Sequence, residues 1–274
     1  MKKILLFIKD SGEAKRTASR LSEFLRTQGC RVRTFVNSPG PAPSLNLRGY
    51  HLMVVVGGDG TFLAGARIAS RYGVPVVGVN EGRFGFLTEI ERDEAEDVLK
   101  EILKGGGKKQ RRMMITTYLK RNGKLRRLGD YLNDVIVSKS ALARIMEIEV
   151  RANGDPMMTV YGDGVIMATP TGSTAYALSA GGPIIYPDSE NLLFVPICPH
   201  TLSNRPVVLP SDFKVSVRVL SDDRACFLTL DGQRGMYLKR GDVVEVSKSK
   251  RYCTIYIHPE KTFFEILRAK LRWG

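Results

Sequence analysis

The sequence reads Leu52-Met53-Val54-Val55-Val56-Gly57-Gly58-Asp59-Gly60-Thr61 within its first quarter. Five apolar residues without polar alternation are typical of a buried strand, and the glycine-rich turn that follows lets backbone N–H groups approach a phosphate closely. We expect a helix to start near Thr61 and to aim its positive end at the same place. The stretch therefore indicates an α/β protein with a phosphate-binding turn and favours a phosphotransferase.

Asp59 lies inside this turn and needs its own explanation. A carboxylate does not bind a phosphate, so Asp59 is predicted either to hold Mg²⁺ or to accept a proton from an attacking hydroxyl. The alternative is a tight turn in which Asp59 only caps the helix. We take Asp59 as the candidate catalytic residue, and its neighbours as a candidate phosphate loop made of Gly57, Gly58, Gly60 and Thr61.

The composition is that of a globular protein with room for two cores: 274 residues, of which 43% are hydrophobic. Its apolar runs are far shorter than the roughly 20 residues of a membrane span, and no signal-peptide cleavage pattern follows the short run Ile4–Ile8. We therefore expect a cytoplasmic protein with no membrane partner. The cysteines and histidines are scattered without paired spacing, which predicts buried thiols and no metal site built from these residues.

The net charge is +14, from 42 basic and 28 acidic side chains. Basic residues are densest over residues 104–112 and 120–127. The Asn122-Gly123 pair in the second cluster indicates a hairpin turn, and no aromatic residues interleave to stack on bases. The charge is thus interpreted as a solvated face, with no nucleic-acid partner.

The first hundred residues alternate strands and helices. We predict strands at Ile4–Ile8, Arg31–Phe35, Leu52–Val56 and Val74–Val79, and helices at Ala14–Gln28 and Thr61–Arg71. Such an alternation of apolar strands and helices predicts a Rossmann-like parallel sheet that is covered on both faces and binds ligands at the carboxyl ends of its strands.

Beyond an acidic helix that ends at Gly105-Gly106-Gly107, short β-like runs recur with turn residues between them. This spacing predicts a β-rich, sandwich-like domain of mostly antiparallel strands. A final strand at Tyr252–Ile257 and an amphipathic helix at Thr262–Leu271 are expected to return to the first domain. The predicted domains are residues 1–104, 105–250 and 251–274.

A second small-residue element follows the predicted strand Gly164–Ala168. It reads Thr169-Pro170-Thr171-Gly172-Ser173-Thr174-Ala175-Tyr176 and continues to Pro183. Hydroxyls and glycines at the start of a short helix suit a nucleotide sugar or phosphate, and Tyr176 can stack on a base. The alternative is a hydroxyl-rich structural turn with an ordinary N-cap.

Polar residues also head or follow two other apolar strands. The segment Asn80–Thr88 comes after Val74–Val79, and Asn133-Asp134 precedes Val135-Ile136-Val137. An Asn-Asp pair can bond both an adenine edge and ribose hydroxyls. Either segment could equally be a turn.

Taken together, these motifs resemble the NAD kinases, also called ATP or polyphosphate NAD kinases. The resemblance covers roughly residues 50–235 and rests, in family order, on Gly57–Thr61, Asn80–Thr88, Leu132–Asp134, Asp163-Gly164, Thr169–Pro183, Pro199–Pro206 and Asp231-Gly232-Gln233. It implies phosphorylation of the adenosine-ribose 2′-hydroxyl of NAD to give NADP(H), with ATP or polyphosphate as donor, Mg²⁺ as cofactor and a homo-oligomer (dimer or tetramer) as the assembly.

The resemblance also implies roles for single residues. Asp59 matches the catalytic aspartate of the family. The positions matching the NAD site are Gly60, Phe86, Asn133, Asp134, Asp163, Thr171, Thr174, Ala175, Tyr176 and Ser179. Phe84 stands where members commonly have Leu, and Asp134 where many have Glu.

Two other interpretations stay open at this point, a second kind of kinase and a protein without catalytic activity. A lipid kinase of the diacylglycerol or sphingosine type shares the Gly-Gly-Asp-Gly-Thr turn and could use the basic surface on an anionic membrane. It does not explain Thr171–Tyr176. A non-catalytic dinucleotide-binding or nucleic-acid-binding module could use the positive charge alone.

Overall fold

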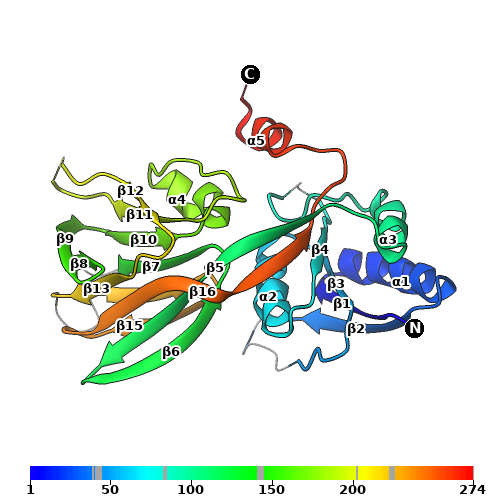
Figure 1. Cartoon of the computed structure of the whole chain (residues 1–274), viewed down its shortest axis with the longest axis horizontal. Coiled ribbons are helices and arrows are strands. Elements are labelled where there is room, and N and C mark those ends of the chain that lie inside the picture. The colour runs from blue at the N-terminus through cyan, green and yellow to red at the C-terminus, as the bar shows by residue number, and fades with distance from the viewer. Residues whose placement is uncertain are drawn as a thin grey trace. The chain divides into compact units, whose positions relative to one another are not determined.

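The computed structural model describes residues 1–38, 40, 45–82, 85–140, 145–201, 203–221 and 226–273. The chain forms two compact units, which Figure 1 shows as ribbons. Unit 1 consists of Met1–Arg111 and Cys253–Gly274, and unit 2 of Arg112–Tyr252. The sequence had placed these divisions at Gly105 and Arg251. Phe84 lies outside the described residues.

Unit 1 contains a parallel sheet in which the order of strands is β2 (Arg31–Asn37), β1 (Lys3–Lys9), β3 (Leu52–Val56) and β4 (Val76–Val79). The end of β16 (Val243–Tyr256) adds to β4 in parallel through Ile255 and Tyr256. The helices are α1 (Gly12–Thr27), α2 (Asp59–Ala69), the single turn η1 (Ser70–Tyr72), α3 (Ala95–Leu103) and α5 (Phe263–Leu271). This confirms the Rossmann-like domain and the return of the C-terminal segment to it.

The strand β3 is buried on both faces because helices cover the sheet on each side. Val54 and Val56 belong to the core that includes Leu21 and Leu25 of α1. On the other face α2 packs so closely that a Cβ on Gly65 would lie 3.0 Å from Met53 Sδ and from Val55 Cγ2. Continuous apolar sequence therefore corresponds to two-sided burial.

Unit 2 is built from two antiparallel sheets. One has the order β12 (Val207–Pro210), β11 (Asn191–Ile197), β10 (Gly164–Ala168), β7 (Asp134–Lys139), β14 (Cys226–Leu230) and β15 (Arg234–Leu238). The strands of the other are β5 (Lys109–Arg121), β6 (Lys124–Tyr131), β8 (Met146–Ala152), β9 (Asp155–Gly162), β13 (Val215–Val219) and β16. Their facing side chains form one core, which confirms the predicted sandwich-like domain.

The strand β7 shows how the first of these sheets is covered. Val135 and Val137 point into the core shared by the two sheets, whereas Ile136 belongs to a second cluster with Ala177 and Leu193. Ala177 lies in α4 (Tyr176–Ser179), which follows the short 3₁₀ helix η2 (Thr171–Thr174). The small-residue element predicted from the sequence thus packs on the outer face of this sheet.

Three expectations from the sequence were wrong or incomplete. The helix α2 begins at Asp59, two residues before the expected start. The strands β11, β12 and β15 were not predicted, and Pro196 inside β11 is one reason, because proline is rare in strand interiors. Cys198 is exposed, whereas the other three cysteines are buried as expected.

No helix among the described residues is both long and apolar enough to cross a membrane.

Candidate active site

The glycine-rich turn of unit 1 connects β3 to α2 at the carboxyl edge of the parallel sheet. Gly57 has φ +154°, and a Cβ there would lie 2.9 Å from Thr61 Oγ1 and 3.2 Å from Lys9 Cβ. Gly58 is the N-cap of α2 and supplies no side-chain cap. The positive end of α2 therefore lies at residues 58–61, where the sequence predicted a phosphate loop.

The carboxylate of Asp59 does not cap α2, so the capping role considered for this residue is wrong. It reaches instead to the segment Phe86–Thr88. Asp59 Oδ2 accepts a hydrogen bond from Phe86 N at 2.9 Å, and Oδ1 accepts from Leu87 N at 3.0 Å, Thr88 N at 3.2 Å and Thr88 Oγ1 at 3.2 Å. The side chain is half-buried. One oxygen is thus fully engaged, whereas the other accepts a single bond from the described residues.

Neighbouring residues make this close approach possible. A Cβ on Gly85 would lie 2.1 Å from Asp59 Oδ1, so only glycine fits beside the carboxylate. Asn80, which is 5% exposed, donates from Nδ2 to the Thr88 carbonyl and to Thr88 Oγ1, both at 3.3 Å. The sequence marked Asn80–Thr88 only as a polar segment. The hydrogen bonds from this segment to the carboxylate of Asp59 were not predicted.

Phe86, a predicted NAD-site residue, is tied to this arrangement through its backbone. Its half-buried ring faces Lys270 of α5, whose Nζ lies 5.9 Å from the ring centroid. The catalytic candidate, the phosphate loop and Phe86 therefore lie together in unit 1.

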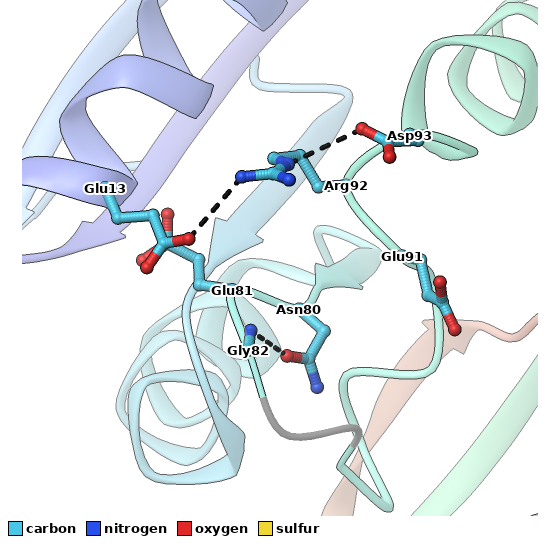
Figure 2. A pocket seen from close by; sticks show the side chains of 7 residues that line it. All are labelled: Glu13, Asn80, Glu81, Gly82, Glu91, Arg92 and Asp93. Carbon is cyan, nitrogen blue, oxygen red and sulfur yellow. Dashed lines mark hydrogen bonds and ion pairs between the residues drawn. The ribbon is translucent and has the colours of Figure 1, made fainter.

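A cavity of about 220 Å³ lies at the same edge of the parallel sheet, between the start of α1, the end of β4 and the segment before α3. Figure 2 shows its lining side chains: Glu13, Asn80, Glu81, Gly82, Glu91, Arg92 and Asp93. Arg92 lies 3.5 Å from both Glu13 and Asp93, and burial raises the pKa of Glu81. This acidic lining disfavours a phosphate, so we assign no phosphate to the cavity.

In unit 2 the ends of three strands meet at one edge of a sheet. Asp134 at the start of β7 pairs with Ala168 at the end of β10, and Thr169 N donates to the Asn133 carbonyl at 2.9 Å. Thr169 Oγ1 donates to the Leu132 carbonyl at 2.5 Å. A Cβ on Gly172 would lie 2.1 Å from the Asn133 carbonyl oxygen. The Asn133-Asp134 pair and the small-residue element are therefore packed directly together.

Several hydroxyls of the small-residue element serve the fold. Ser173 Oγ donates to the Pro170 carbonyl at 2.7 Å and accepts from Ile185 N at 3.0 Å. Thr174 Oγ1 donates to the Thr171 carbonyl at 3.3 Å. Thr171 is only 6% exposed, and its hydroxyl accepts from Arg112 Nη1 at 3.5 Å. The surface of the element is instead formed by Tyr176, which is 45% exposed, with Ser179 exposed beside it.

Asp231, at the end of β14, joins this edge and had no role assigned from the sequence. Its carboxylate accepts hydrogen bonds from the backbone N–H groups of Leu132, Asn133 and Asp134. Asp134 is 3% exposed, and burial together with the charge of Asp231 raises its pKa to about 7. A carboxyl group with this pKa carries a proton for part of the time at neutral pH, so it can donate as well as accept a hydrogen bond.

Asp163 is the one predicted residue of unit 2 that the structure separates from the others. It precedes β10, and its Oδ1 pairs with Lys139 Nζ at 2.7 Å. Thr169 follows the opposite end of the same five-residue strand. A strand of this length spans about 17 Å, so Asp163 lies outside the edge that carries Asn133.

Two family models match the chain. The ATP-NAD kinase N-terminal domain matches residues 42–107, and the ATP-NAD kinase C-terminal domain matches residues 132–257. An NAD kinase of Aquifex aeolicus (strain VF5) is 56% identical over 274 residues, which is 100% of both chains. An NAD kinase of Magnetococcus marinus (strain ATCC BAA-1437 / JCM 17883 / MC-1) is 44% identical over 272 residues, covering 95% of this chain and 90% of the relative.

Solved structures agree with the sequence relatives. An NAD kinase from Archaeoglobus fulgidus in complex with ATP has a TM-score of 0.79 and 27% identity, with 100% of both chains covered. Yeast NADH kinase complexed with NADH has a TM-score of 0.89 over 100% of this chain and 88% of that chain, at 21% identity, and so shares the fold. From the family models and the full-length relatives, the chain belongs to the ATP-NAD kinase family.

Proposed function

We propose that the chain is an NAD kinase that transfers the terminal phosphoryl group of ATP to the 2′-hydroxyl of the adenosine ribose of NAD, with NADP and ADP as products. Identity of 56% over the whole chain to a protein named NAD kinase carries this conclusion. The relative from Archaeoglobus fulgidus was solved with ATP, which supports ATP as the donor. A lipid kinase and a non-catalytic binding module are not supported by these relatives.

In the proposed mechanism Asp59 is the general base. Its Oδ2 accepts only one hydrogen bond from the described residues, so this oxygen retains lone pairs for the proton of the 2′-hydroxyl. As the hydroxyl oxygen attacks the terminal phosphorus, its proton passes to Oδ2 and ADP leaves with the electron pair of the broken P–O bond. The positive end of α2, at Gly57, Gly58, Gly60 and Thr61, stabilises the negative charge of the donor phosphates.

Mg²⁺ is the proposed cofactor. Within the described part of the chain, no group of three or more His, Cys, Asp or Glu side chains could hold a metal ion. Mg²⁺ commonly uses only one or two carboxylates and completes its shell with water and substrate phosphates. Asp59 Oδ2 fits as one such ligand, which keeps open the alternative role predicted for this residue. The ion would supply neutralisation of the donor's phosphate charge.

The NAD site is proposed to use the predicted residues in two groups. In unit 2, Asn133 and Asp134 would bond the adenosine half, Tyr176 would contact the base with its exposed ring, and Thr174, Ala175 and Ser179 would add further contacts. Gly60 and Phe86 of unit 1 keep a role in NAD binding by resemblance alone. Thr171 would act mainly by supporting the turn, because its hydroxyl is buried beside Arg112. Asp163 keeps a role in NAD binding only by resemblance.

The proposal extends to polyphosphate as an alternative donor, NADP(H) as a bound product and a homo-oligomer, which rest on the resemblance alone. It also includes a cytoplasmic location, which rests on the short apolar runs of the sequence. The deciding measurement is NADP formation by the purified protein, with ATP and polyphosphate supplied separately. Diacylglycerol and sphingosine in place of NAD serve as the control acceptors. Phosphorylation of a lipid without NADP formation would overturn the proposal, and so would binding of NAD without turnover with either donor.

A further inference from the structure

Asp231 lies at a buried turn where β14 passes into β15. It is 4% exposed, and its φ of +51°, with +64° at Gly232, is typical of the Asp-Gly turn that joins two strands of a hairpin. The pairing of β14 with β7 ends at Leu230 and Val135. Beyond this pair, Asp231 N still donates to the Asp134 carbonyl at 3.0 Å. The turn accounts for this backbone conformation, but burial of a carboxylate is costly unless it is well bonded, so the side chain of Asp231 has a specific task.

The side chain of Asp231 shows what that task is. Oδ1 accepts from Asn133 N at 2.8 Å and from Asp134 N at 3.2 Å, and Oδ2 accepts from Leu132 N at 3.1 Å. Three successive backbone N–H groups thus converge on one carboxylate that lies almost a hundred residues further along the chain. A carboxylate with several backbone donors is strongly favoured in its ionised form. It therefore fixes the backbone of Leu132–Asp134.

The backbone of Asn133 is then held from both sides. The N–H group of Asn133 donates to the Asp231 carboxylate, and the carbonyl of Asn133 accepts from Thr169 N at 2.9 Å. Gly172 packs against the same carbonyl oxygen. The side-chain oxygen of Asn133 is buried and accepts no hydrogen bond from the described residues. A fixed, buried acceptor without a partner is costly unless a ligand supplies the donor. The amino group of an adenine and a ribose hydroxyl are such donors.

We propose that Asp231 is a positioning residue of the NAD site, which aims the Asn133 side chain at the adenosine half of NAD through three backbone hydrogen bonds. This inference rests on the proposed function, because it names NAD as the ligand. Asp231 itself touches no substrate in this scheme. Its removal should therefore weaken NAD recognition while it leaves recognition of the phosphoryl donor unchanged.

Two substitutions separate the carboxylate from the backbone conformation. Asp231→Gly keeps the left-handed φ and removes both acceptor oxygens, and with them all three hydrogen bonds. Asp231→Asn also tolerates this φ and keeps one oxygen for Asn133 N and Asp134 N. We expect the Gly variant to raise the Kd and KM for NAD about 10-fold or more, the Asn variant to raise them about 3-fold, and both to leave the KM for ATP within about twofold of wild type.

The matched control is Asp242→Asn. Asp242 is also a buried aspartate of unit 2, at 2% exposed, but its carboxylate binds Arg121 and Lys239 N. This variant should lower the Tm and leave the KM for NAD unchanged. A merely structural role for Asp231 would make the two aspartates behave alike, so a comparable rise in the KM for NAD in both would overturn the proposal.

The readouts keep the two hypotheses apart. Calorimetric titration with NAD measures recognition without turnover, and NADP formation measures the activity. Wild-type protein that binds NAD but forms no NADP would defeat the proposed function and leave the Asp231 test intact. A wild-type Kd for NAD in Asp231→Gly, or an equal rise in the KM for NAD and for ATP, would overturn the role of Asp231. If Asp231→Gly does not fold, Asp231→Asn decides the role in the same way through its smaller shift.

Discussion

In unit 1 a single carboxylate, that of Asp59, is both the proposed reacting group and the anchor of Phe86–Thr88. In unit 2 these tasks belong to different residues, because Asp231 anchors the backbone and Asn133 presents the side chain. The two arrangements use the same chemistry, namely an aspartate that accepts backbone N–H groups. We therefore expect a substitution of Asp59 to change catalysis and local structure together. In unit 2 the two effects can be separated, because Asp231 and Asn133 can be substituted one at a time.

The largest effect is expected from Asp59→Asn. The amide cannot act as a base, which is typically worth about 10²–10⁴-fold in kcat. It also turns an N–H group toward Phe86 N, where the carboxylate accepted a bond, so the segment Phe86–Thr88 should loosen and the KM for NAD should rise somewhat as well. Steady-state kinetics of NADP formation checks both effects.

Thr88→Val is the control for this test, since it removes the hydroxyl that bonds Asp59 Oδ1 and keeps the charge. We expect it to cost about 10–100-fold in kcat/KM, the amount of one lost hydrogen bond to a charged group. A kcat near wild type in Asp59→Asn would remove Asp59 from the chemistry. A loss of kcat in Thr88→Val as large as that in Asp59→Asn would show that Asp59 acts mainly by anchoring Phe86–Thr88 and not as a base.

Gly85→Ala tests the anchor of Asp59 by crowding it. The new Cβ would lie 2.1 Å from Asp59 Oδ1 and 2.3 Å from Thr88 Oγ1, so these groups must move. Overpacking of this kind costs about 1–3 kcal/mol, which should lower the Tm by several degrees together with kcat. The control is Gly82→Ala, whose Cβ would have no atom within 4 Å. Equal Tm values for the two variants would contradict this close contact.

Asn133→Ala tests the side-chain role that is proposed for unit 2, separately from the backbone role of Asp231. The substitution removes the proposed acceptor without touching the backbone bonds that Asp231 makes. We expect the KM for NAD to rise about 10-fold with kcat and the KM for ATP little changed. Separate titration of each substrate decides the assignment. An unchanged KM for NAD with a raised KM for ATP would move this pair to the donor side.

The smallest effect concerns the pH dependence of stability through Asp134. Its folded pKa, raised to about 7, lies above the ordinary value of 3.8, so the unfolded chain loses this proton first as pH rises. The contribution of Asp134 to stability is therefore fully present below pH 3.8 and is lost as pH rises toward 7. The side chain in Asp134→Asn does not ionise, so the variant has no such loss. The Tm of the variant minus the Tm of the wild type should therefore increase from pH 5 to pH 8. Thermal unfolding measures this difference.

The exposed Asp188 provides the control for that experiment. Asp188→Asn should show no such growth of the Tm difference. A Tm difference for Asp134→Asn that stayed constant across this pH range would mean that Asp134 titrates as an exposed aspartate does. The effect of Asp231 on its neighbour would then be purely geometric.

The sequence predicted the elements that carry a local signal. The apolar run and glycines of Leu52–Thr61 identified β3, the turn and Asp59, because strand burial and close backbone approach each require particular residue types at adjacent positions. The partners of Asp59 were missed because Gly85 and Thr88 lie almost 30 residues away, and only folding brings them to the carboxylate.

The same distinction explains unit 2. Asn133-Asp134 and the small-residue element were recognised as motifs, but the pattern did not show that Ser173 and Thr174 use their hydroxyls within the turn. Nor did it show that Asp231 holds the pair from a distant strand. Asp163 adjoins the motif in sequence, yet a whole strand separates the two in space.

The hydrogen bonds of Asp59 also give the proposed reaction a temporal order. While the carboxylate is charged, it holds Phe86–Thr88 with charge-assisted bonds, which are about twice as strong as neutral ones. Under the proposed mechanism, the proton taken from the ribose neutralises Asp59 at the moment NADP forms. The hydrogen bonds that Asp59 accepts from Phe86–Thr88 then weaken until the proton passes to solvent. Under this proposal Phe86–Thr88 contacts the product, so each turnover briefly makes this segment more mobile at the time when the product dissociates.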